Sequence, residues 1–252
     1  MDYSLFNILL YAWIGLAVIT FISLFFVSAP YGRFVRTNWG PGIPNWLGWI
    51  IMELPSPVLV VYFVATGEGL KNAVIWFLVA LWVLHYFHRT FIYPFRITSR
   101  NKKMPFAIAL MALVFNIGNG FFNGYYLGNY AGSLHHYTFT NIFFISGLIL
   151  FFVGVFINMR SDQILINLRK NTSSGYAIPQ GGMFKYVSSP NYLGELIEWL
   201  GFAIMAAGLP GFSFFIWTFA NLVPRALDNH KWYKKTFEDY PKDRKAIFPF
   251  VL

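Results

Sequence analysis

The stretch Ile142-Phe-Phe-Ile-Ser-Gly-Leu-Ile-Leu-Phe-Phe-Val-Gly-Val-Phe-Ile-Asn158 is almost entirely apolar. An α-helix needs about 20 mostly apolar residues to cross the hydrocarbon core of a bilayer. Runs of this kind recur along the chain and are continuous rather than alternating, which favours helices over the strands of a β-barrel. The sequence therefore predicts an all-α integral membrane bundle of seven transmembrane helices. The predicted spans are residues 5–27, 44–66, 73–95, 105–125, 139–158, 191–208 and 211–228.

The composition agrees with this class of protein. Of the 252 residues, 57% are hydrophobic and 12% are charged, whereas a soluble domain carries about 25% charged residues. The chain has no cysteine, which excludes disulfides, thiolate chemistry and cysteine-bound metals. No internal repeat is visible, so residues 1–252 are expected to form a single membrane domain. Residues 159–190 are expected to be a cytoplasmic loop and residues 229–252 a cytoplasmic tail.

The basic residues give the orientation of the bundle. Lys71 is the only Lys or Arg in the connections that follow the second, fourth and sixth spans. Nearly all others lie after the first, third and fifth spans or towards the C-terminus. Because cytoplasmic connections carry the excess of positive charge, we expect the N-terminus outside and the C-terminus in the cytoplasm. The net charge of +9 is thereby explained by topology and contact with anionic lipid, in preference to nucleic-acid binding.

Three carboxylates fall inside segments that should lie in lipid: Glu53, Glu195 and Glu198. A charged side chain at the centre of a membrane helix costs roughly 2.5–3.5 kcal/mol or more, so such residues usually serve a function. Glu53 precedes Pro55 and Pro57, which remove backbone donors and predict a kink beside the acid. A purely structural kink is the alternative. The two separate glutamate motifs suggest two half-sites facing one cavity.

The third span ends with Tyr86, Arg89 and Tyr93 on one face, at i, i+3 and i+7. An aromatic belt with an arginine reaching the headgroups would explain this face equally well. His85 and His88 lie three residues apart, but no carboxylate stands at ligand spacing on the same helix. We therefore expect no metal site.

Three further polar stripes occur at the predicted cytoplasmic ends of helices. Each could be a solvated face on its own, but together they predict the lining of one polar pocket. The glycine-rich segment 172–190 would close over that pocket. No GxGxxG, P-loop, GxSxG or HExxH motif is present. The stripes are Asn158, Asp162 and Arg169; Asn191, Glu195 and Glu198; and Arg225, Asn229 and Tyr233.

Several longer motifs resemble the steroid 5α-reductase family, in a bacterial-type form. The strongest are Gly175-Tyr-Ala-Ile-Pro-Gln-Gly-Gly-Met-Phe-Lys-Tyr-Val187 and Asn191-Tyr-Leu-Gly-Glu-Leu-Ile-Glu-Trp-Leu-Gly-Phe202. The ending Phe237-Glu-Asp-Tyr-Pro-Lys-Asp-Arg-Lys-Ala-Ile-Phe-Pro-Phe250 is equally similar. Upstream, Glu53-Leu-Pro-Ser56 and His85-Tyr-Phe-His-Arg-Thr-Phe91 match in order and spacing, and Ala29-Pro-Tyr-Gly-Arg33 is a weaker match. The resemblance covers nearly the whole chain.

The resemblance implies a seven-helix enzyme that reduces the Δ4 double bond of a 3-oxo-Δ4 steroid by hydride transfer from NADPH to C5. It implies that Glu53 and Tyr86 are catalytic and contact the 3-ketone. Arg100 would also suit phosphate recognition. The residues implied for the NADPH site are Asn158, Asp162, Arg169, Tyr176, Asn191, Glu195, Arg225, Asn229 and Tyr233, with Arg89 and Glu198 nearby.

Other functions stay open at this stage. Another branch of the superfamily would reduce a polyprenal or a trans-2-enoyl-CoA. A membrane methyltransferase and a sterol-binding or transport protein are further alternatives, distinguished by which cofactor binds. The expected partners are a steroid or similar lipid substrate and membrane lipids, with no nucleic acid and no metal, and the protein is expected to be a monomer. Both a bacterial inner membrane and the endoplasmic reticulum fit a site that faces the cytoplasm.

Overall fold

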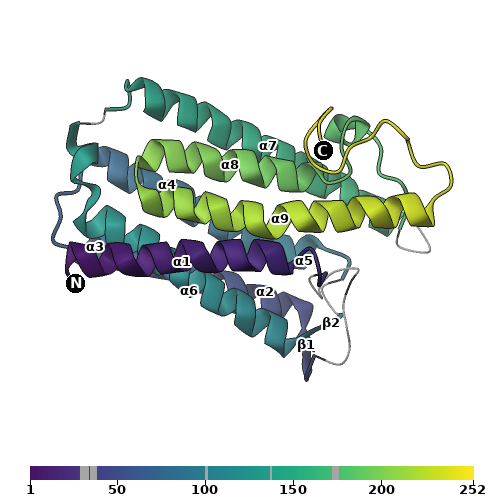
Figure 1. Ribbon diagram of the computed structural model, residues 1–252, viewed down its shortest axis with the longest axis horizontal. Coiled ribbons are helices and arrows are strands. Elements are labelled where there is room, and N and C mark those ends of the chain that lie inside the picture. Colours follow the sequence, from purple (N-terminus) through teal and green to yellow (C-terminus); the bar gives the residue numbers. More distant parts are fainter. Residues whose placement is uncertain (29–33, 35–38, 100–101, 137, 172–175) are drawn as a thin grey trace. The chain divides into compact units, whose positions relative to one another are not determined.

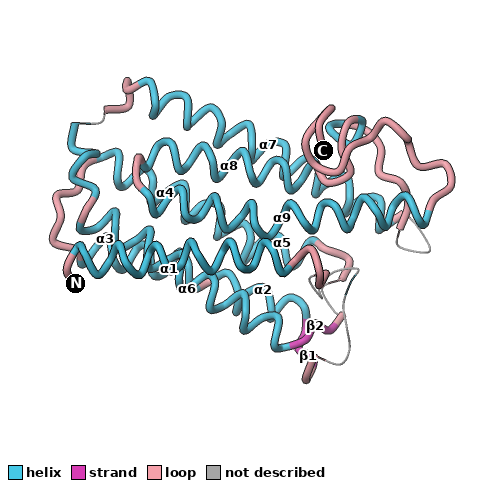
Figure 2. The backbone as a smooth tube through the Cα atoms, viewed as in Figure 1, coloured by secondary structure: helices cyan, strands magenta, loops and turns pink. Residues whose placement is uncertain are grey.

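The computed structural model describes residues 1–28, 34, 39–99, 102–136, 138–171 and 176–252. The weaker motif match at Ala29–Arg33 and the proposed phosphate contact at Arg100 lie outside these residues. Figures 1 and 2 show a chain built almost wholly of helices, as predicted. The helices are α1 (Tyr3–Ser23), α2 (Asn45–Glu53), α3 (Pro55–Thr66), α4 (Ala73–Phe87), α5 (Tyr93–Arg96), α6 (Phe106–Asn129), α7 (Ile142–Lys170), α8 (Pro190–Ala206) and α9 (Leu209–Thr236).

Three short helical turns and one small ribbon complete the described structure. The turns are the π-helical η2 (His88–Ile92) and the 3₁₀ turns η3 (Ala131–His136) and η4 (Gly182–Lys185). Strand β1 (Gly42–Pro44) pairs antiparallel with β2 (Lys103–Pro105), with Ile43 opposite Met104. The sequence did not predict this ribbon. It joins the segments that lead into α2 and α6.

Five helical segments are long and apolar enough to cross a membrane, among the residues described. They are Tyr3–Ser23, Asn45–Thr66, Ala73–Arg96, Phe106–Asn129 and Ile142–Lys170, and they coincide with the first five predicted spans. The sixth and seventh predicted spans are also helical, as α8 and α9. Neither is among the five helices that are long and apolar enough to cross a membrane. Helix α8 has 17 residues. The count of seven spans stays a prediction.

Two prolines explain the break in the second span. Helix α2 ends at Glu53 and α3 begins at Pro55, so the helix is interrupted at Leu54, where the sequence predicted a kink. Pro55 and Pro57 have no N–H to donate to the carbonyls four residues earlier. Glu53 therefore stands at the end of a helix inside the second span.

A second irregularity follows Tyr86. Helix α4 continues into the π turn η2, where the N–H of Tyr93 donates to the carbonyl of His88, five residues back. Pro94 comes directly afterwards and cannot donate to the carbonyl of Thr90. The helix widens where proline would otherwise interrupt the series of backbone hydrogen bonds. Such π turns are frequent at functional sites.

The chain divides into two compact units, which we describe separately. Unit 1 comprises residues 1–29, 146–202 and 213–252, and unit 2 comprises residues 30–145 and 203–212. The prediction of a single membrane domain is not tested by this division. Each unit contains one helix pair held together at glycines.

In unit 2, α3 packs along α6 through Gly120, Gly124 and Gly128. A methyl group added at Gly124 would lie 2.8 Å from Cα of Val60, and one at Gly120 would lie 2.9 Å from the carbonyl oxygen of Ser56. Small residues at this spacing let membrane helices approach backbone to backbone. This approach fixes the position of α6 against the proline-broken span.

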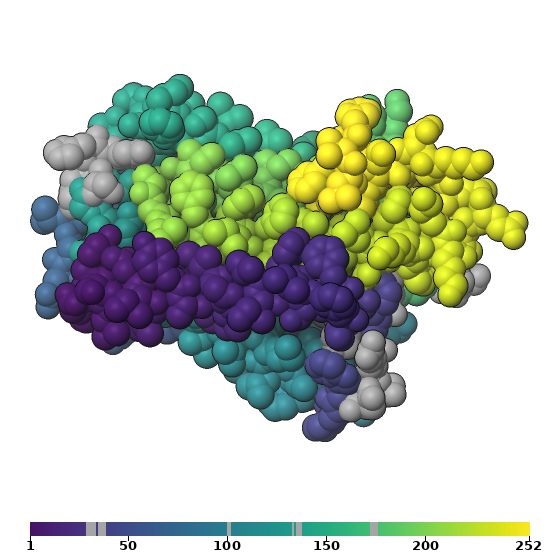
Figure 3. Space-filling view, viewed as in Figure 1, coloured from purple at the N-terminus to yellow at the C-terminus, as the bar shows by residue number. Residues whose placement is uncertain are grey.

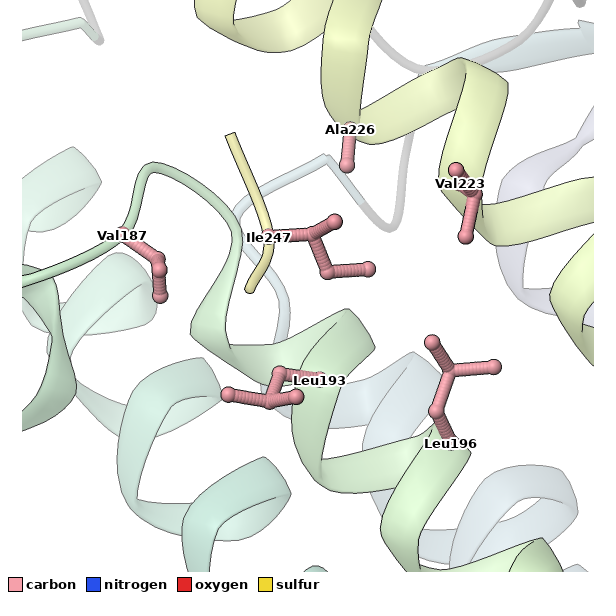
Figure 4. Close-up of a cluster of buried hydrophobic side chains, with 6 residues drawn as sticks. All are labelled: Val187, Leu193, Leu196, Val223, Ala226 and Ile247. Atoms are coloured by element: carbon pink, nitrogen blue, oxygen red, sulfur yellow. The ribbon is translucent and has the colours of Figure 1, made fainter. Parts of the chain in front are cut away.

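In unit 1, α7 packs against α8 in the same way. Gly154 faces the backbone of Gly194 and Glu198, and Gly194 faces the backbone of Asn158. Figure 1 shows α7, α8 and α9 running alongside one another. A buried apolar cluster joins α8, α9 and the chain around them, drawn in Figure 4; it consists of Val187, Leu193, Leu196, Val223, Ala226 and Ile247.

Helix α1 packs on α9 by one face and presents the other outward. Trp13 contacts Trp217 with ring centroids 4.8 Å apart. Much of its other surface is exposed and apolar, including Ile8, Tyr11 and Ile19, and the helix lies open in the space-filling view of Figure 3. A face of this composition suits contact with lipid tails.

Helix α7 extends further than the predicted span. It runs to Lys170, so residues 159–170, which the sequence assigned to a loop, form its last turns. Neither glycine nor proline occurs between Asn158 and Lys170, so nothing in the sequence ends the helix there. The stripe of Asn158, Asp162 and Arg169 is therefore carried on continuous helix.

Candidate functional site

Three side chains from three helices meet in unit 2: Glu53 of α2, Tyr86 of α4 and Asn116 of α6. We call them the tyrosine cluster. The phenol of Tyr86 donates to Oδ1 of Asn116 at 2.9 Å. The amide nitrogen of Asn116 donates to the carbonyl of Met52 at 2.8 Å and reaches Oε2 of Glu53 at 3.4 Å. The two residues implied as catalytic are therefore linked through a third that the sequence analysis did not identify.

The surroundings of the tyrosine cluster are largely apolar and buried. Tyr86 and Asn116 are each 3% exposed. The ring of Trp82 stacks on Tyr86 with centroids 5.5 Å apart, and its indole nitrogen donates to Oγ of Ser56 at 3.1 Å. Hydrogen bonds are stronger where water is scarce. The cluster is thus a preorganised group of polar atoms in an apolar setting.

Arg89 lies in unit 2, unlike the other residues predicted for the cofactor site. Its guanidinium stands over the rings of Trp49, at 4.6 Å, and Tyr93, at 4.9 Å. The predicted face of Tyr86, Arg89 and Tyr93 is therefore interrupted by the π turn, and Arg89 makes cation–π contacts with two rings. Its role at the cofactor stays a prediction.

In unit 1, Asn158, Asp162 and Asn191 form a second group, which we call the asparagine cluster. The amide nitrogen of Asn158 donates to the backbone carbonyl of Asn191 at 2.9 Å. The amide nitrogen of Asn191 donates to Oδ1 of Asp162 at 3.1 Å. Asn158 and Asp162 are 7% and 6% exposed. Two of the predicted polar stripes therefore meet where α7 crosses α8.

The stripe on α9 makes contacts of its own within unit 1. Nε of Arg225 donates to the hydroxyl of Tyr192 at 2.6 Å, and the amide nitrogen of Asn229 reaches Oγ of Ser189 at 3.4 Å. Tyr233 is buried and stacks flat on Tyr240, with centroids 5.3 Å apart. Each of these contacts links α9 to the start of α8 or to the chain that follows α9.

The remaining predicted residues lie on α8 and around the loop. Arg169 stands over the ring of Tyr176 at 5.8 Å, and Tyr176 contacts Trp232 at 5.3 Å. Glu195 is partly buried and Glu198 is 1% exposed. Glu198 occupies the part of α8 that Gly154 approaches. Its position is that of a residue at a helix crossing.

A third group, the tail cluster, was missed by the sequence analysis. Oγ of Ser188 lies 2.6 Å from Nδ1 of His230 and 2.6 Å from the hydroxyl of Tyr240, and it donates to the carbonyl of Lys245 at 3.0 Å. A hydroxyl has one donor and two acceptor sites. The carbonyl takes the Ser188 proton, so His230 and Tyr240 both donate to Ser188.

The tail cluster binds the C-terminal segment to the start of α8. Backbone bonds join Ser188 to Lys245 and Ser189 to Ala246. Buried Arg244 donates to the carbonyl of Pro179 at 3.2 Å. Burial, followed by the charges of Lys234, Arg244 and Lys245, lowers the pKa of His230, and burial raises the pKa of Tyr240. The cluster therefore holds both groups in their neutral forms.

The described residues contain no group of three or more His, Asp or Glu side chains that could hold a metal ion. The polar groups that the fold does bring together are amides, carboxyls, phenols and guanidiniums on long apolar helices. These features define a helical membrane protein that carries buried polar clusters on its apolar helices.

Comparisons with known proteins give the family. Residues 102–252 match the family model described as 3-oxo-5-alpha-steroid 4-dehydrogenase. The steroid 5-alpha-reductase DET2 of Solanum lycopersicum is 42% identical, over 99% of this chain and 98% of that protein. The 3-oxo-5-alpha-steroid 4-dehydrogenase 1 of Bos taurus is 37% identical over 98% and 97%, and that of Homo sapiens is 38% identical over 89% and 87%. The chain belongs to the 3-oxo-5-alpha-steroid 4-dehydrogenase family, which confirms the resemblance.

Proposed function

We propose that this protein is a membrane oxidoreductase that reduces the Δ4 double bond of a 3-oxo-Δ4 steroid to the 5α-reduced ketone, with NADPH as reductant. Near full-length similarity to proteins named for this reaction supports the proposal. The observation that carries it is the tyrosine cluster, in which a phenol and a carboxyl are held together in an apolar setting. Such a pair suits a substrate that is apolar except for a ketone.

The proposed role of the tyrosine cluster is to stabilise negative charge on the ketone oxygen. Hydride addition at C5 moves the double-bond electrons through C4 and C3 onto that oxygen, and C4 then takes a proton from water. Donors preorganised at a developing oxyanion lower the barrier by roughly 3–4 kcal/mol. Tyr86 donates its phenol proton, and a neutral Glu53 carboxyl donates directly or holds Tyr86 in place.

The proposed NADPH site is formed by residues of unit 1, with Arg89 as a further candidate. When bound, NADPH supplies the hydride and leaves as NADP⁺. The polar side chains present fit such a ligand in kind: the amides of Asn158 and Asn191 and the carboxyl of Glu195 suit a carboxamide, and Arg169 and Arg225 suit phosphates. Asp162 orients the Asn191 amide. The other proposed contacts are Tyr176, Glu198, Asn229 and Tyr233.

The proposed topology has seven spans, with the N-terminus outside and the C-terminus cytoplasmic. The distribution of Lys and Arg supports it. In this arrangement the loop before α8 and the tail 229–252 cover the cofactor from the cytoplasm. The protein is proposed to act as a monomer in a bacterial inner membrane or the endoplasmic reticulum.

The test is reduction of a 3-oxo-Δ4 steroid by the purified protein with NADPH, with the 5α-reduced ketone identified as product. Glu53→Gln and Tyr86→Phe should lose turnover while NADPH still binds. A panel that includes a polyprenal and a trans-2-enoyl-CoA separates the steroid reaction from those of related reductases. Turnover of the panel without any steroid reduction would overturn the proposed substrate. Parental steroid turnover by both variants would overturn the proposed carbonyl site.

A further inference from the structure

Asn116 occupies the centre of the tyrosine cluster. Its amide contacts Tyr86 on one side and Glu53 with Met52 on the other. Helix α6 is apolar up to this position, where Asn116 is the first of three buried asparagines, and a buried amide is costly unless its hydrogen bonds are made. The side chain is 3% exposed. The free-energy cost of burying the Asn116 amide therefore depends on whether these hydrogen bonds are made.

The Met52 carbonyl fixes which way the amide points. A carbonyl can only accept, so the amide nitrogen of Asn116 must face it, at 2.8 Å. Oδ1 then faces Tyr86 and accepts the phenol proton. The same nitrogen faces Oε2 of Glu53, at 3.4 Å, and this favours Oε1 as the oxygen that carries the proton of a neutral Glu53. One backbone carbonyl thus sets the direction of every hydrogen bond described in the cluster.

We propose that Asn116 is a positioning residue for steroid reduction, which holds the Tyr86 phenol and the Glu53 carboxyl in one arrangement and directs the protons of both. The inference rests on the proposed function of Glu53 and Tyr86. Before substrate binds, Asn116 takes the Tyr86 proton. On binding, Tyr86 turns that proton to the ketone oxygen, while Asn116 keeps its bonds to Met52 and Glu53. Asn116 itself touches neither substrate nor cofactor.

The main test replaces Asn116 by leucine, which has a similar shape and no polar atoms. We expect kcat for the steroid to fall roughly a hundredfold, because misplacing catalytic groups by about 1 Å costs this much. KM for the steroid and the affinity for NADPH should change little. Adding Tyr86→Phe should lower kcat little further, because residues that act as a unit are not additive.

Asn123 provides a matched control on the same helix. It is also a buried asparagine, at 1% exposure, and its amide donates to the backbone carbonyl of Asn119 at 3.1 Å. Asn123→Leu removes an equally buried amide without touching Tyr86 or Glu53. It should lower thermal stability as much as Asn116→Leu does, while kcat stays near the parent value.

Asn116→Asp gives a readout that packing alone would not produce. A neutral aspartic acid reproduces the amide, since one oxygen accepts from Tyr86 and the hydroxyl donates to Met52. The ionised form cannot donate. The ratio of variant to parent kcat should therefore rise as the pH falls. Glu53, His85 and Tyr86, titratable groups nearby on α2 and α4, are the same in both proteins, so any change in their titration arises from the carboxyl introduced at position 116.

The outcomes separate the two proposals. If Glu53→Gln and Tyr86→Phe lose turnover but Asn116→Leu keeps the parental kcat, the role of Asn116 is overturned and the carbonyl site stands. A flat kcat ratio for Asn116→Asp across the pH range also overturns it, even if the leucine variant does not fold. If Tyr86→Phe and Glu53→Gln are themselves fully active, the carbonyl site falls and the role of Asn116 falls with it.

Discussion

The tyrosine cluster and the asparagine cluster are both buried polar groups on apolar helices, but they are held in different ways. In the tyrosine cluster, side chains from three helices bond through the amide of Asn116. In the asparagine cluster, Asn158 bonds to a backbone carbonyl of α8, and Gly194 lies directly against the backbone of Asn158. The first geometry depends mainly on side-chain atoms, whereas the second combines the side-chain bond from Asn191 to Asp162 with the close approach of two helices.

The glycines sharpen this difference. In unit 2 the close approach of α3 and α6 runs through Gly120, Gly124 and Gly128, all C-terminal to Asn116 along α6. In unit 1 the close approach involves Gly154 and Gly194, and Gly194 lies directly against the backbone of Asn158 in the asparagine cluster. A backbone shift at the glycines should therefore disturb the second cluster directly and the first only through the position of α6.

The largest expected effect is on catalysis, where a change in each cluster should alter a different kinetic parameter. Tyr86→Phe should lower kcat by roughly a hundred- to a thousandfold, because a donor to the developing oxyanion is lost. NADPH affinity should stay near the parent value. Asn191→Ala should instead raise KM for NADPH with a smaller change in kcat. Steady-state kinetics and NADPH titration of both variants check this, and a loss in the same parameter for both would remove the functional distinction.

The next effect concerns stability. Gly194→Leu and Gly124→Leu each force a side chain into a backbone contact, and overpacking costs roughly 1–3 kcal/mol or more. Thermal unfolding in detergent should show lower midpoints for both. Only Gly194→Leu should also impair NADPH binding in the protein that remains folded. Gly15→Ala is the control, because a methyl group at Gly15 meets nothing within 4 Å; a comparable loss there would contradict the packing argument.

Much of this arrangement was predictable from the sequence, because it depends on local chemistry. The prolines after Glu53 predicted the break at Leu54. Helical spacing predicted one polar stripe with Asn158 and Asp162 and another with Asn191, and the structure brings these three residues together. These inferences need only a helix and its period. They fail where a helix end carries no signal, as at α7, which continues to Lys170.

The parts that escaped prediction depend on tertiary contacts. Asn116 was visible as an asparagine on an apolar helix, with Asn119 and Asn123 further along the same helix. Its importance follows from where α6 meets α2 and α4, which no local pattern specifies. The tail cluster is similar, because Ser188 meets Tyr240 only when the chain after α9 folds back to pair with residues 187–189.

A smaller effect is expected from charge within the asparagine cluster. Asp162→Asn keeps an oxygen that can accept from Asn191 but removes the charge that strengthens the bond. Hydrogen bonds to charged groups exceed neutral ones by about 1 kcal/mol, which corresponds to roughly fivefold in affinity. KM for NADPH should rise by about that factor, with little change in KM for the steroid. An unchanged KM for NADPH would show that the orientation of Asn191 does not depend on the Asp162 charge.

The smallest expected effect is a pH dependence of stability that originates outside both clusters, at His230. Its pKa is lowered in the folded protein, mainly by burial and then by Lys234, Arg244 and Lys245. As the pH falls below the ordinary histidine pKa of about 6.5, the unfolded chain takes up a proton that the folded protein binds less readily, so stability decreases. His230→Asn keeps an amide donor for Ser188 but cannot titrate. The midpoint of thermal unfolding should therefore fall less for this variant than for the parent between neutral and mildly acidic pH. Equal slopes would assign the pH dependence to other groups, and a kcat change in His230→Asn at neutral pH would tie the tail cluster to the proposed NADPH site.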